Sequence, residues 1–448
     1  MTSSCVDLAE LAPPGPGQAP LTVHGLRAHI ADRLDLLPSW TWRIQRVPFG
    51  LHHPVWVDDP DFDLGYHLRE ATVAAPGGPT EVEAYLASVL PGRLDQRHPL
   101  WQIILLHGLP DGRQALVFRF HHSIADGAAL LTTLDRLFGP PGAGAAVVAG
   151  GPDAVAPPRP RTVLAAGARE QARNWAEVPG LLRTTLRRFK SVEDRRAAAE
   201  VKVPRAMADA PHSVLNDSYS ADRAYARLRL PVADVQRVKA AAGCAVSDVV
   251  LAVVSGGLRT YLGARDQLPD RPLVANVPVA NDPPGAPPRQ HGNRFANFFT
   301  ALATDVDDPM ERLTAITTGT AEAKRQLDLQ GLDTLPDWLD RLPPAVAEPA
   351  ARAMAKRSRA RTDAADFNVL VSNVRVTTTT WAVGGRAVEH VYMSGPVADG
   401  AGLNVTITGY GGDLHISIVA NPSAVAEPAE LAADLRAALV ELVEAVPS

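Results

Sequence analysis

The sequence predicts a mixed α/β protein built from two layered domains. A chain of 448 residues is too long for one ordinary hydrophobic core and favours two. Strand-like and helical segments are interspersed in both halves, which is typical of sheets covered by helices. A stretch rich in glycine, alanine and proline, from Gly139 to about Pro160, has the composition of a linker. We therefore expect an N-terminal domain at 21–138, a linker with basic crossover helices at 139–212 and a C-terminal domain at 213–448.

Residues 1–20 are expected to form a mobile start outside the core. They contain the run Pro13-Pro14-Gly15-Pro16-Gly17 and show no periodic pattern. Helical spacing of apolar residues begins between His24 and Leu37. A second helix is predicted from Thr80, because Thr80 and Glu83 have the spacing of a capping box.

Two apolar runs, Trp101–His107 and Arg113–Phe120, indicate a β-hairpin closed by the turn residues Pro110-Asp111-Gly112. The second strand leads directly into the segment His121-His122-Ser123-Ile124-Ala125-Asp126-Gly127. Most residues of this segment are polar or small, whereas the segments on either side are apolar. Helical spacing follows from Ala128 to Phe138. The two histidines are therefore expected at a strand-to-helix turn.

A basic amphipathic helix is predicted near Leu181, where apolar residues up to Phe189 alternate with Arg183, Arg187 and Arg188. Two interpretations stay open. The helix is either a crossover helix that lies on its own protein with a solvated basic face, or a surface for anionic lipid or the phosphates of CoA.

The second half is predicted to contain a buried helix from Ser247-Asp248, in which Gly256 and Gly257 permit a close backbone approach. Strands and a closing helix follow. The strand-like runs of this half are Ala224–Leu230, Pro272–Asn281, Asn293–Asp305, Phe367–Val376, Arg386–Met393, Gly402–Gly409 and Asp413–Val419, and the closing helix is Glu427–Val443.

Composition excludes several classes of protein. With 46% hydrophobic residues, 21% charged residues and a net charge of -5, the chain is typical of soluble globular proteins and is not expected to bind nucleic acid. The two cysteines, Cys5 and Cys244, give neither a disulfide framework nor metal-ligand spacing. No run approaches the ~20 apolar residues of a transmembrane segment, and no signal peptide is recognised. We expect a cytoplasmic location, with the surface of the inner membrane or of lipid droplets as an alternative.

The 121–127 turn has the chemistry of general-base catalysis. A histidine with a pKa near neutrality takes a proton from a hydroxyl, amine or thiol as that group attacks a carbonyl, and His122 is the candidate base. Asp126 is expected to orient the turn through hydrogen bonds or an arginine partner, and Gly127 to let the helix begin close to the strand. The role of His121 stays open.

Two other kinds of site are less well supported. A metal site lacks a second ligand cluster, although His52-His53, His291 and His415 remain candidates for convergence in the fold. A serine hydrolase lacks a nucleophile elbow, because the nearest match, Ser255-Gly256-Gly257, lies inside a predicted helix. No metal is therefore expected.

Residues 121–127 resemble the HHxxxDG motif of the chloramphenicol acetyltransferase-like superfamily. Further segments, in the same order, resemble the bacterial wax ester synthase/diacylglycerol acyltransferase family. These segments are Pro99-Leu100-Trp101, Leu215-Asn216, Ser247-Asp248-Val249-Val250-Leu251-Ala252, Asn276-Val277-Pro278-Val279, Gly292-Asn293-Arg294, Val371-Ser372-Asn373-Val374 and Gly402-Leu403-Asn404. The resemblance extends from about Leu21 to the C-terminus.

This resemblance implies two chloramphenicol acetyltransferase-like subdomains that face each other across a central channel. It also implies an enzyme that transfers a fatty acyl group from acyl-CoA to diacylglycerol or a long-chain alcohol, with His122 as the base, Asp126 structural and no cofactor beyond the CoA substrate. Ser372 and Asn373 are the first candidates for oxyanion donors and Asn276 the second. Asn373 equally fits a cap at a strand end.

The chain departs from the family pattern in three places. Arg375-Val376-Thr377 stands where the family usually has Pro-Gly-Pro, Ser247 stands where it usually has asparagine, and residues 1–20 match its first strand poorly. A helix cap is sufficient to explain Ser247. Arg294 is a candidate ion-pair partner of Asp126. These departures bear on substrate identity more than on reaction type.

Three functions remain open at the level of sequence. The first is the acyl-CoA-dependent O-acyltransferase that makes triacylglycerol or wax ester. The second is an acyltransferase of specialised metabolism that uses a carrier-protein-bound acyl donor or an amine acceptor. The third is a non-catalytic lipid-binding protein, against which the intact His122, Asp126 and Gly127 argue.

Overall fold

The computed structural model describes residues 4–140, 160–205, 208–217, 220–283, 285–359, 361, 363–374 and 380–446. Most of the predicted linker, 141–159, and the altered segment after Val374 lie outside the described residues.

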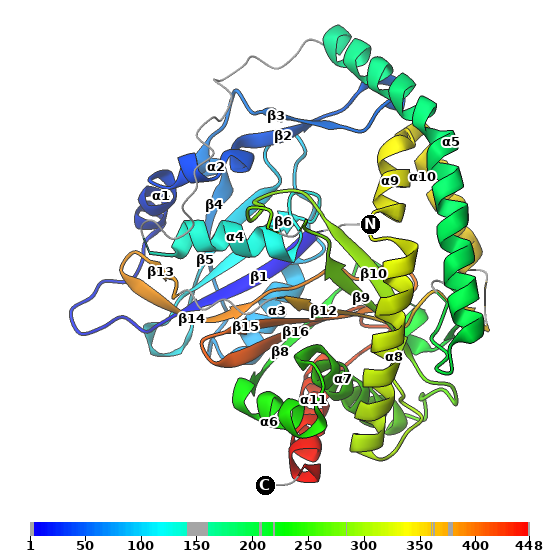
Figure 1. Ribbon diagram of the computed structural model, residues 1–448. Helices are drawn as coiled ribbons and strands as arrows, with labels where there is room; N and C mark the ends of the chain where they lie inside the picture. The colour runs from blue at the N-terminus through cyan, green and yellow to red at the C-terminus, as the bar shows by residue number, and fades with distance from the viewer. Residues whose placement is uncertain are drawn as a thin grey trace.

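Two six-stranded sheets form the centre of the protein (Figure 1). The first has the strand order β13-β14-β1-β6-β5-β4 and the second β10-β9-β12-β15-β16-β8. The strands of the first sheet are Ala382–Val383, Arg386–Tyr392, Ser4–Leu11, Ala115–His121, Trp101–His107 and Leu68–Thr72. Those of the second are Phe295–Ala301, Val274–Ala280, Val369–Val374, Leu403–Tyr410, Asp413–Ala420 and Ala224–Pro231. The mixed α/β prediction is confirmed.

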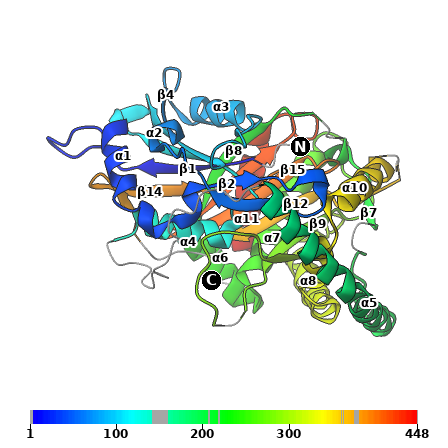
Figure 2. The same ribbon diagram turned by 90° about the horizontal axis from the view of Figure 1, so that it is seen from above.

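Helices cover both sheets. They are α1 Val23–Ala31, α2 Leu64–His67, α3 Pro79–Val89, α4 Gly127–Phe138, α5 Pro160–Ala198, α6 Val232–Ala242, α7 Val246–Gly263, α8 Pro309–Gln330, α9 Thr334–Arg341, α10 Pro344–Arg359 and α11 Pro428–Ala445. Helices α1, α2 and α4 lie beside the first sheet, α6, α7 and α11 lie below the second, and α5 runs along the outer edge of the molecule (Figures 1 and 2). Two short ribbons, β2 Trp42–Gln45 with β3 Val55–Asp58 and β7 Ala210–Pro211 with β11 Ala364–Ala365, complete the strands.

The prediction of a mobile N-terminus is wrong for Ser4–Leu11, which forms β1 in the interior of the first sheet. Strand β1 pairs with β14 on one side and with β6 on the other. Cys5 and Leu11 face one hydrophobic cluster while Val6 and Leu8 face another. A strand buried on both faces lacks the alternation of polar and apolar residues that identifies a half-buried strand. The proline-rich run that suggested mobility begins only after this strand.

The expected C-terminal domain, 213–448, also needs correction, because β13 and β14 belong to the first sheet. Strand β14 pairs with β1, and Tyr392 of β14 lies opposite Leu8. The two sheets meet at this point, where buried Arg227 of β8 forms an ion pair with Glu10 of β1. The lobes are therefore joined by an exchanged strand as well as by the linker.

A buried carboxyl group at this junction makes folding stability depend on pH. Asp7 is 1% exposed; its Oδ1 accepts a 2.7 Å hydrogen bond from the backbone N–H of Ser394, and its Oδ2 has no partner among the described residues. Burial raises the pKa of Asp7 to about 8, although the Ser394 N–H opposes that shift. The folded protein thus keeps a proton that the unfolded chain releases above about pH 4.

We predict that the free energy of unfolding falls as pH rises from about 4 to 8, because the unfolded chain binds fewer protons in that window. Asp7→Asn removes this titration, so its stability is expected to change much less with pH. Urea unfolding of both proteins across the window measures the difference. Parallel pH profiles for the two proteins would contradict the assignment.

Helices α7 and α11 cross closely, as the glycine pair in α7 predicts. A Cβ atom added at Gly257 would lie 2.9 Å from the backbone nitrogen of Leu435 and 3.0 Å from its Cα. Backbone atoms cannot yield as a flexible side chain does. Gly257→Val is therefore expected to lower the free energy of unfolding by about 3 kcal/mol, measured by chemical denaturation; an unchanged midpoint would contradict the close crossing. Gly263→Val, where a Cβ meets no atom within 4 Å, is the matched control.

Candidate active site

The histidine pair lies where strand β6 ends and helix α4 begins, as predicted. Strand β6 delivers His121, whose backbone N–H donates a 3.0 Å hydrogen bond to the carbonyl of Leu100. Asp126 is the N-cap residue of α4, and its side chain accepts from the backbone N–H of Ala129 at 3.0 Å. The turn is therefore fixed at both ends by backbone hydrogen bonds.

The Pro99-Leu100-Trp101 segment, which leads into β5, packs beside this turn. The indole N–H of Trp101 donates to the carbonyl of Trp40 at 2.8 Å, and the two rings are in contact, with centroids 4.2 Å apart and planes tilted by 40°. His67 contacts the Trp101 carbonyl at 2.7 Å. A small apolar pocket next to the turn is lined by these tryptophans together with Phe120, Ile124, Ala125 and Leu130.

His122 is half-buried and electrically neutral at physiological pH. Desolvation lowers its pKa, while the charge of Asp126 and a hydrogen bond to the carbonyl of His122 itself act in the opposite direction. A neutral imidazole has one ring nitrogen that can accept a proton.

His121 is held differently. Its Nδ1 lies 2.8 Å from the Ser123 hydroxyl and accepts a 3.2 Å hydrogen bond from the Ser123 N–H. Burial and the neighbouring His122 lower the pKa of His121. Ser123 therefore engages the Nδ1 lone pair of His121.

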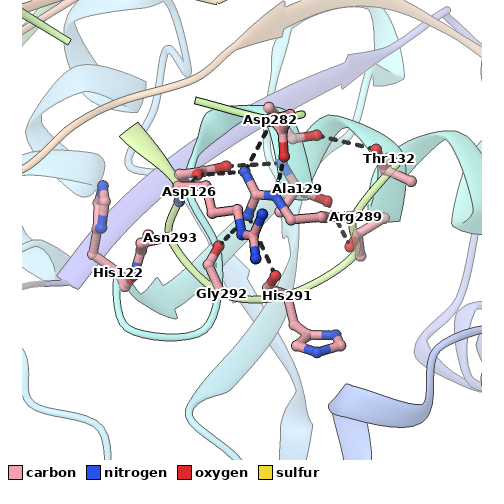
Figure 3. Close-up of polar contacts among 12 residues, drawn as sticks. His122, Asp126, Ala129, Thr132, Asp282, Arg289, His291, Gly292 and Asn293 are labelled. Atoms are coloured by element: carbon pink, nitrogen blue, oxygen red, sulfur yellow. Dashed lines mark hydrogen bonds and ion pairs between the residues drawn. The ribbon is translucent and has the colours of Figure 1, made fainter. Parts of the chain in front are cut away.

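Asp126 orients the turn through an arginine, but this arginine is Arg289 and not Arg294. The Arg289 guanidinium forms a 2.8 Å ion pair with Asp126 Oδ2, and Arg294 contributes only its backbone N–H to the same oxygen, also at 2.8 Å. Arg289 additionally binds Asp282 at 2.5 Å and the Gly292 carbonyl at 2.7 Å. Figure 3 shows these contacts converging on Arg289, with the His122 ring directed away from them.

The loop of residues 281–294, which joins β9 to β10 in the second sheet, brings the second lobe onto the turn. Gly292 donates to the Ile124 carbonyl at 2.6 Å, and the Asn293 side chain donates to the His122 carbonyl at 2.9 Å. The His122 ring meets the Phe295 ring edge to face, with centroids 6.1 Å apart. The candidate base therefore lies at the contact between the two lobes.

Strand β12 approaches the same turn. A Cβ atom added at Gly127 would lie 3.0 Å from Cγ2 of Val374 at the end of β12, so Gly127 permits this approach. Ser372 and Asn373 lie on β12 just before Val374, and Asn373 is exposed. Asn276 on β9 lies opposite Leu370 of β12; it is buried, and its Oδ1 has no partner among the described residues.

Asp248 serves the fold of the second lobe, whereas the expectation that Ser247 caps the helix is wrong, because α7 begins at Val246 and its N-cap residue is Ala245. Asp248 is buried at the start of α7, accepts from the Ala245 N–H at 3.0 Å and accepts from the Thr320 hydroxyl of α8 at 2.8 Å. These bonds cap α7 and join it to α8. These contacts are sufficient to explain Asp248 without a catalytic role.

The remaining histidines do not form a metal centre within the part of the chain that the structure describes. No group of three or more histidine, cysteine or carboxylate side chains there is placed to bind an ion. His53 contacts the Leu339 carbonyl, His291 packs on Trp42, and His415 pairs with His390. Among the same residues, no single helix is long and apolar enough to cross a membrane, and only α6 and α7 together, bent by 105°, reach the required length and composition.

Sequence reasoning missed Arg289 and the role of Asn293. The Gly292-Asn293-Arg294 segment was recognised only by resemblance, and nothing in the local pattern pairs Arg289 with a residue 163 positions away. The one available signal was the expectation of an arginine partner for Asp126.

Comparisons with known proteins agree with this geometry. Residues 4–250 match the wax ester synthase/diacylglycerol acyltransferase catalytic domain, and residues 291–443 match the C-terminal domain of the same family. Two Mycobacterium tuberculosis H37Rv proteins named as candidate diacylglycerol O-acyltransferases are similar to this chain. One is 32% identical over 424 residues, covering 94% of this chain and 87% of the relative, and the other is 33% identical over 436 residues, covering 94% and 88%.

Solved structures show the same two-lobed fold. The wax ester synthase/diacylglycerol acyltransferase from Marinobacter aquaeolei VT8 aligns with a TM-score of 0.64 at 24% identity, covering 98% of this chain and 94% of that one. The first condensation domain of the calcium-dependent antibiotic synthetase aligns with a TM-score of 0.60 at 17% identity, covering 99% and 91%. The predicted fold is thus confirmed. With both family domains matched in order around the HHxxxDG turn, the chain belongs to the wax ester synthase/diacylglycerol acyltransferase family and is an acyltransferase of that type.

Proposed function

We propose that the protein transfers a fatty acyl group from acyl-CoA to the hydroxyl of diacylglycerol or a long-chain alcohol, with His122 as the general base. The observation that carries this proposal is the place of the His122 ring at the contact between the lobes, beside Phe295, where Ser123, Asp126 and Asn293 bond to other atoms and not to this ring. Burial lowers the pKa of His122 and so favours its neutral form. A group in that state accepts the acceptor's proton without first losing one of its own.

The proposed reaction follows from this state. The His122 imidazole takes the hydroxyl proton as the acceptor oxygen attacks the thioester carbonyl carbon, which forms the C–O bond and a tetrahedral oxyanion. The oxyanion collapses, the C–S bond breaks, and the imidazolium returns the proton to the CoA sulfur. The products are triacylglycerol or wax ester and free CoA, and no cofactor beyond the acyl-CoA substrate takes part.

Ser372 and Asn373 are proposed as donors to the oxyanion, with Asn276 as the alternative. The approach of β12 to Gly127 supports the first pair, because it brings the end of that strand toward the histidine turn. The position of Asn276, buried on β9 beside β12, supports the second, since its side-chain N–H groups are hydrogen-bond donors. Replacing each with alanine and comparing kcat at saturating substrate distinguishes the two assignments.

A substrate panel tests the proposed function. Purified protein is incubated with palmitoyl-CoA and with palmitoyl-acyl carrier protein, each against diolein, hexadecanol and a long-chain amine, and thiol release and lipid products are followed together. We expect ester formation from the CoA donor with diolein or hexadecanol. Turnover only with the carrier protein or the amine would favour the specialised-metabolism alternative, and no turnover with any pair would contradict the proposal.

The location proposed is the cytoplasm, with the enzyme acting at a lipid surface. The support is chemical, because diacylglycerol and long-chain alcohols partition into lipid whereas acyl-CoA is delivered from water. Fractionation of cells that express the full chain, with and without high salt, tests this location.

A further inference from the structure

One face of helix α5 carries a continuous exposed apolar line, here called the apolar stripe. Its members recur at alternating intervals of four and three residues, and they are Trp175, Pro179, Leu182, Leu186 and Phe189. The four large side chains are exposed by 56%, 47%, 61% and 53% respectively. Single exposed apolar residues are ordinary on a protein surface, but a line of four large ones along a single helix indicates a contact surface.

The stripe is distinct from the face by which α5 packs on its own protein. That inner face uses Gln171, Thr185 and Arg188. They bond to the Arg341 carbonyl at 2.9 Å, to the Trp338 indole at 3.0 Å and to the Thr334 hydroxyl at 2.7 Å. The stripe residues follow inner-face positions by one residue, a rotation of about 100° around the helix. Packing against α9 therefore leaves the stripe uncovered.

Helix α9 extends the apolar surface. The contacts of α5 with α9 show that the two helices run antiparallel, since Arg188 bonds to Thr334 and Gln171 to Arg341. Leu339 follows the inward-facing Trp338 by one residue, as Leu186 follows Thr185. In an antiparallel pair these positions turn to the same side, and Leu339 is 51% exposed. The apolar surface is thus wider than a single helix.

A basic row lies beside the stripe, one further residue around α5. It consists of Arg169, Arg173, Arg183, Arg187 and Lys190, all exposed. None of these cations lies within 4.0 Å of a carboxylate in the described part of the chain. Helix α5 contains nine Arg or Lys and four Asp or Glu, whereas the whole chain has a net charge of -5. The positive charge is therefore local to the helix that carries the stripe.

We infer that the apolar stripe and basic row of α5 form a docking surface for an anionic phospholipid bilayer. The helix lies in the plane of the membrane interface, its large apolar side chains enter the acyl boundary, and the arginines meet lipid phosphates. The sequence left two interpretations of this helix open, and each fits one of its faces. The inner face packs on the protein, as a crossover helix does, and the outer face fits an anionic lipid surface. The inference deepens the proposed location and assigns it to particular residues.

A second copy of the chain fits this surface poorly. Antiparallel two-fold pairing of α5 through the stripe would place the basic row of one copy beside that of its partner, with like charges in contact. An anionic surface instead complements the row. Charge complementarity thus selects the lipid as the occupant.

Vesicle co-sedimentation of the full chain tests this surface, without acyl-CoA, so that its outcome is independent of catalysis. We expect binding to phosphatidylcholine vesicles that contain about one third phosphatidylglycerol, and much weaker binding to phosphatidylcholine alone. Replacing Arg183, Arg187 and Lys190 with alanine is expected to weaken binding to the anionic vesicles about 100-fold, at about fivefold for each basic residue near the surface. Replacing Leu182, Leu186 and Phe189 with serine is expected to weaken it at least ~10-fold.

Matched controls use exposed residues elsewhere. Replacing Arg352, Lys356 and Arg357 of α10 with alanine removes as many cations, and Leu329→Ser with Val440→Ser removes exposed apolar side chains outside the stripe. Both controls should bind vesicles like the unaltered chain. Equal binding by the stripe variants and the controls would overturn the inference, as would a stripe-dependent dimer in sedimentation velocity without vesicle binding. Failure of the substrate panel alone would leave the docking surface standing.

Discussion

His122→Ala is expected to lower kcat by about 10²- to 10⁴-fold, the range that general-base catalysis contributes. The ring is half-buried, and the main-chain bonds of the turn do not depend on it, since Asn293 bonds to the carbonyl of His122 and not to its side chain. The thermal midpoint should therefore change little while turnover is lost. Thiol release from palmitoyl-CoA in the presence of diolein measures the loss.

The pH profile gives a second measure of the same residue. Because desolvation lowers the pKa of His122, the base is already deprotonated at neutral pH. The value of kcat/KM is thus expected to fall only on the acidic side of the usual histidine pKa of about 6.5, and to stay level from there toward alkaline pH. His121→Ala is the control, since Ser123 engages the Nδ1 lone pair of His121. Equal losses in the two variants, or an acidic limb above neutrality, would remove His122 from the role of base.

The parts of the fold that the sequence predicted well are local in character. The hairpin of β5 and β6 and the start of α4 follow from apolar runs, a turn tripeptide and helical spacing within a few dozen residues. The close crossing at Gly257 was likewise visible as a small residue in an apolar helix. In each case the signal and the structure lie in the same stretch of chain.

The errors concern long-range pairing. Strand β1 pairs with β14 across more than 380 residues, Leu8 lying opposite Tyr392, and burial on both faces removed its periodic signal. Thr80 and Glu83 had the spacing of a capping box, yet α3 begins at Pro79, and Glu83 lies instead near Arg227 of the second lobe, 3.7 Å away. A tertiary contact there overrode a local preference.

The site shows the same division. The residue types at 121–127 predicted the turn and the contacts by which Asp126 orients it, because both follow from local chemistry. The role of His122 as the base stays a prediction. The arginine partner could not be chosen from the sequence. Arg294 follows the recognised Asn293 directly, but its backbone N–H and not its guanidinium reaches Asp126, and Arg289 reaches it only because the 281–294 loop folds back over the turn.

Removal of the Asp126 carboxylate is expected to be the most destabilising change at the site. Asp126→Ala removes the acceptor of the Arg294 and Ala129 N–H groups and one of the two carboxylates that the Arg289 guanidinium binds. Breaking a buried pair by removing one partner costs about 3–5 kcal/mol, and loss of a helix cap alone costs about 1 kcal/mol. Calorimetric unfolding should show a correspondingly lower midpoint.

Arg289→Ala distinguishes the contribution of the Asp126–Arg289 ion pair to stability from that of the α4 helix cap. It leaves Asp126 with its bonds to Ala129 and Arg294, so its effect on stability should be smaller, and the double variant should be less destabilised than the sum of the single ones. Arg352→Ala is the matched control, because Arg352 forms a 2.8 Å ion pair with Glu348 whose side chains are 76% and 59% exposed. An exposed pair of this kind contributes little. The Asp126 pair has the same 2.8 Å length with side chains 17% and 10% exposed, and Arg289→Ala also removes the bonds to Asp282 and the Gly292 carbonyl. Arg289→Ala is therefore expected to cost more than Arg352→Ala.

Both site variants should also lose turnover, because the ion pair fixes the loop that carries Asn293, and Asn293 in turn holds the main chain of His122. This loss should differ from that of His122→Ala. It combines a lower midpoint with a lower kcat and is partly restored at low temperature, where more of the turn stays in place. A loss of kcat in Arg289→Ala with an unchanged midpoint at every temperature would instead place Arg289 in contact with substrate.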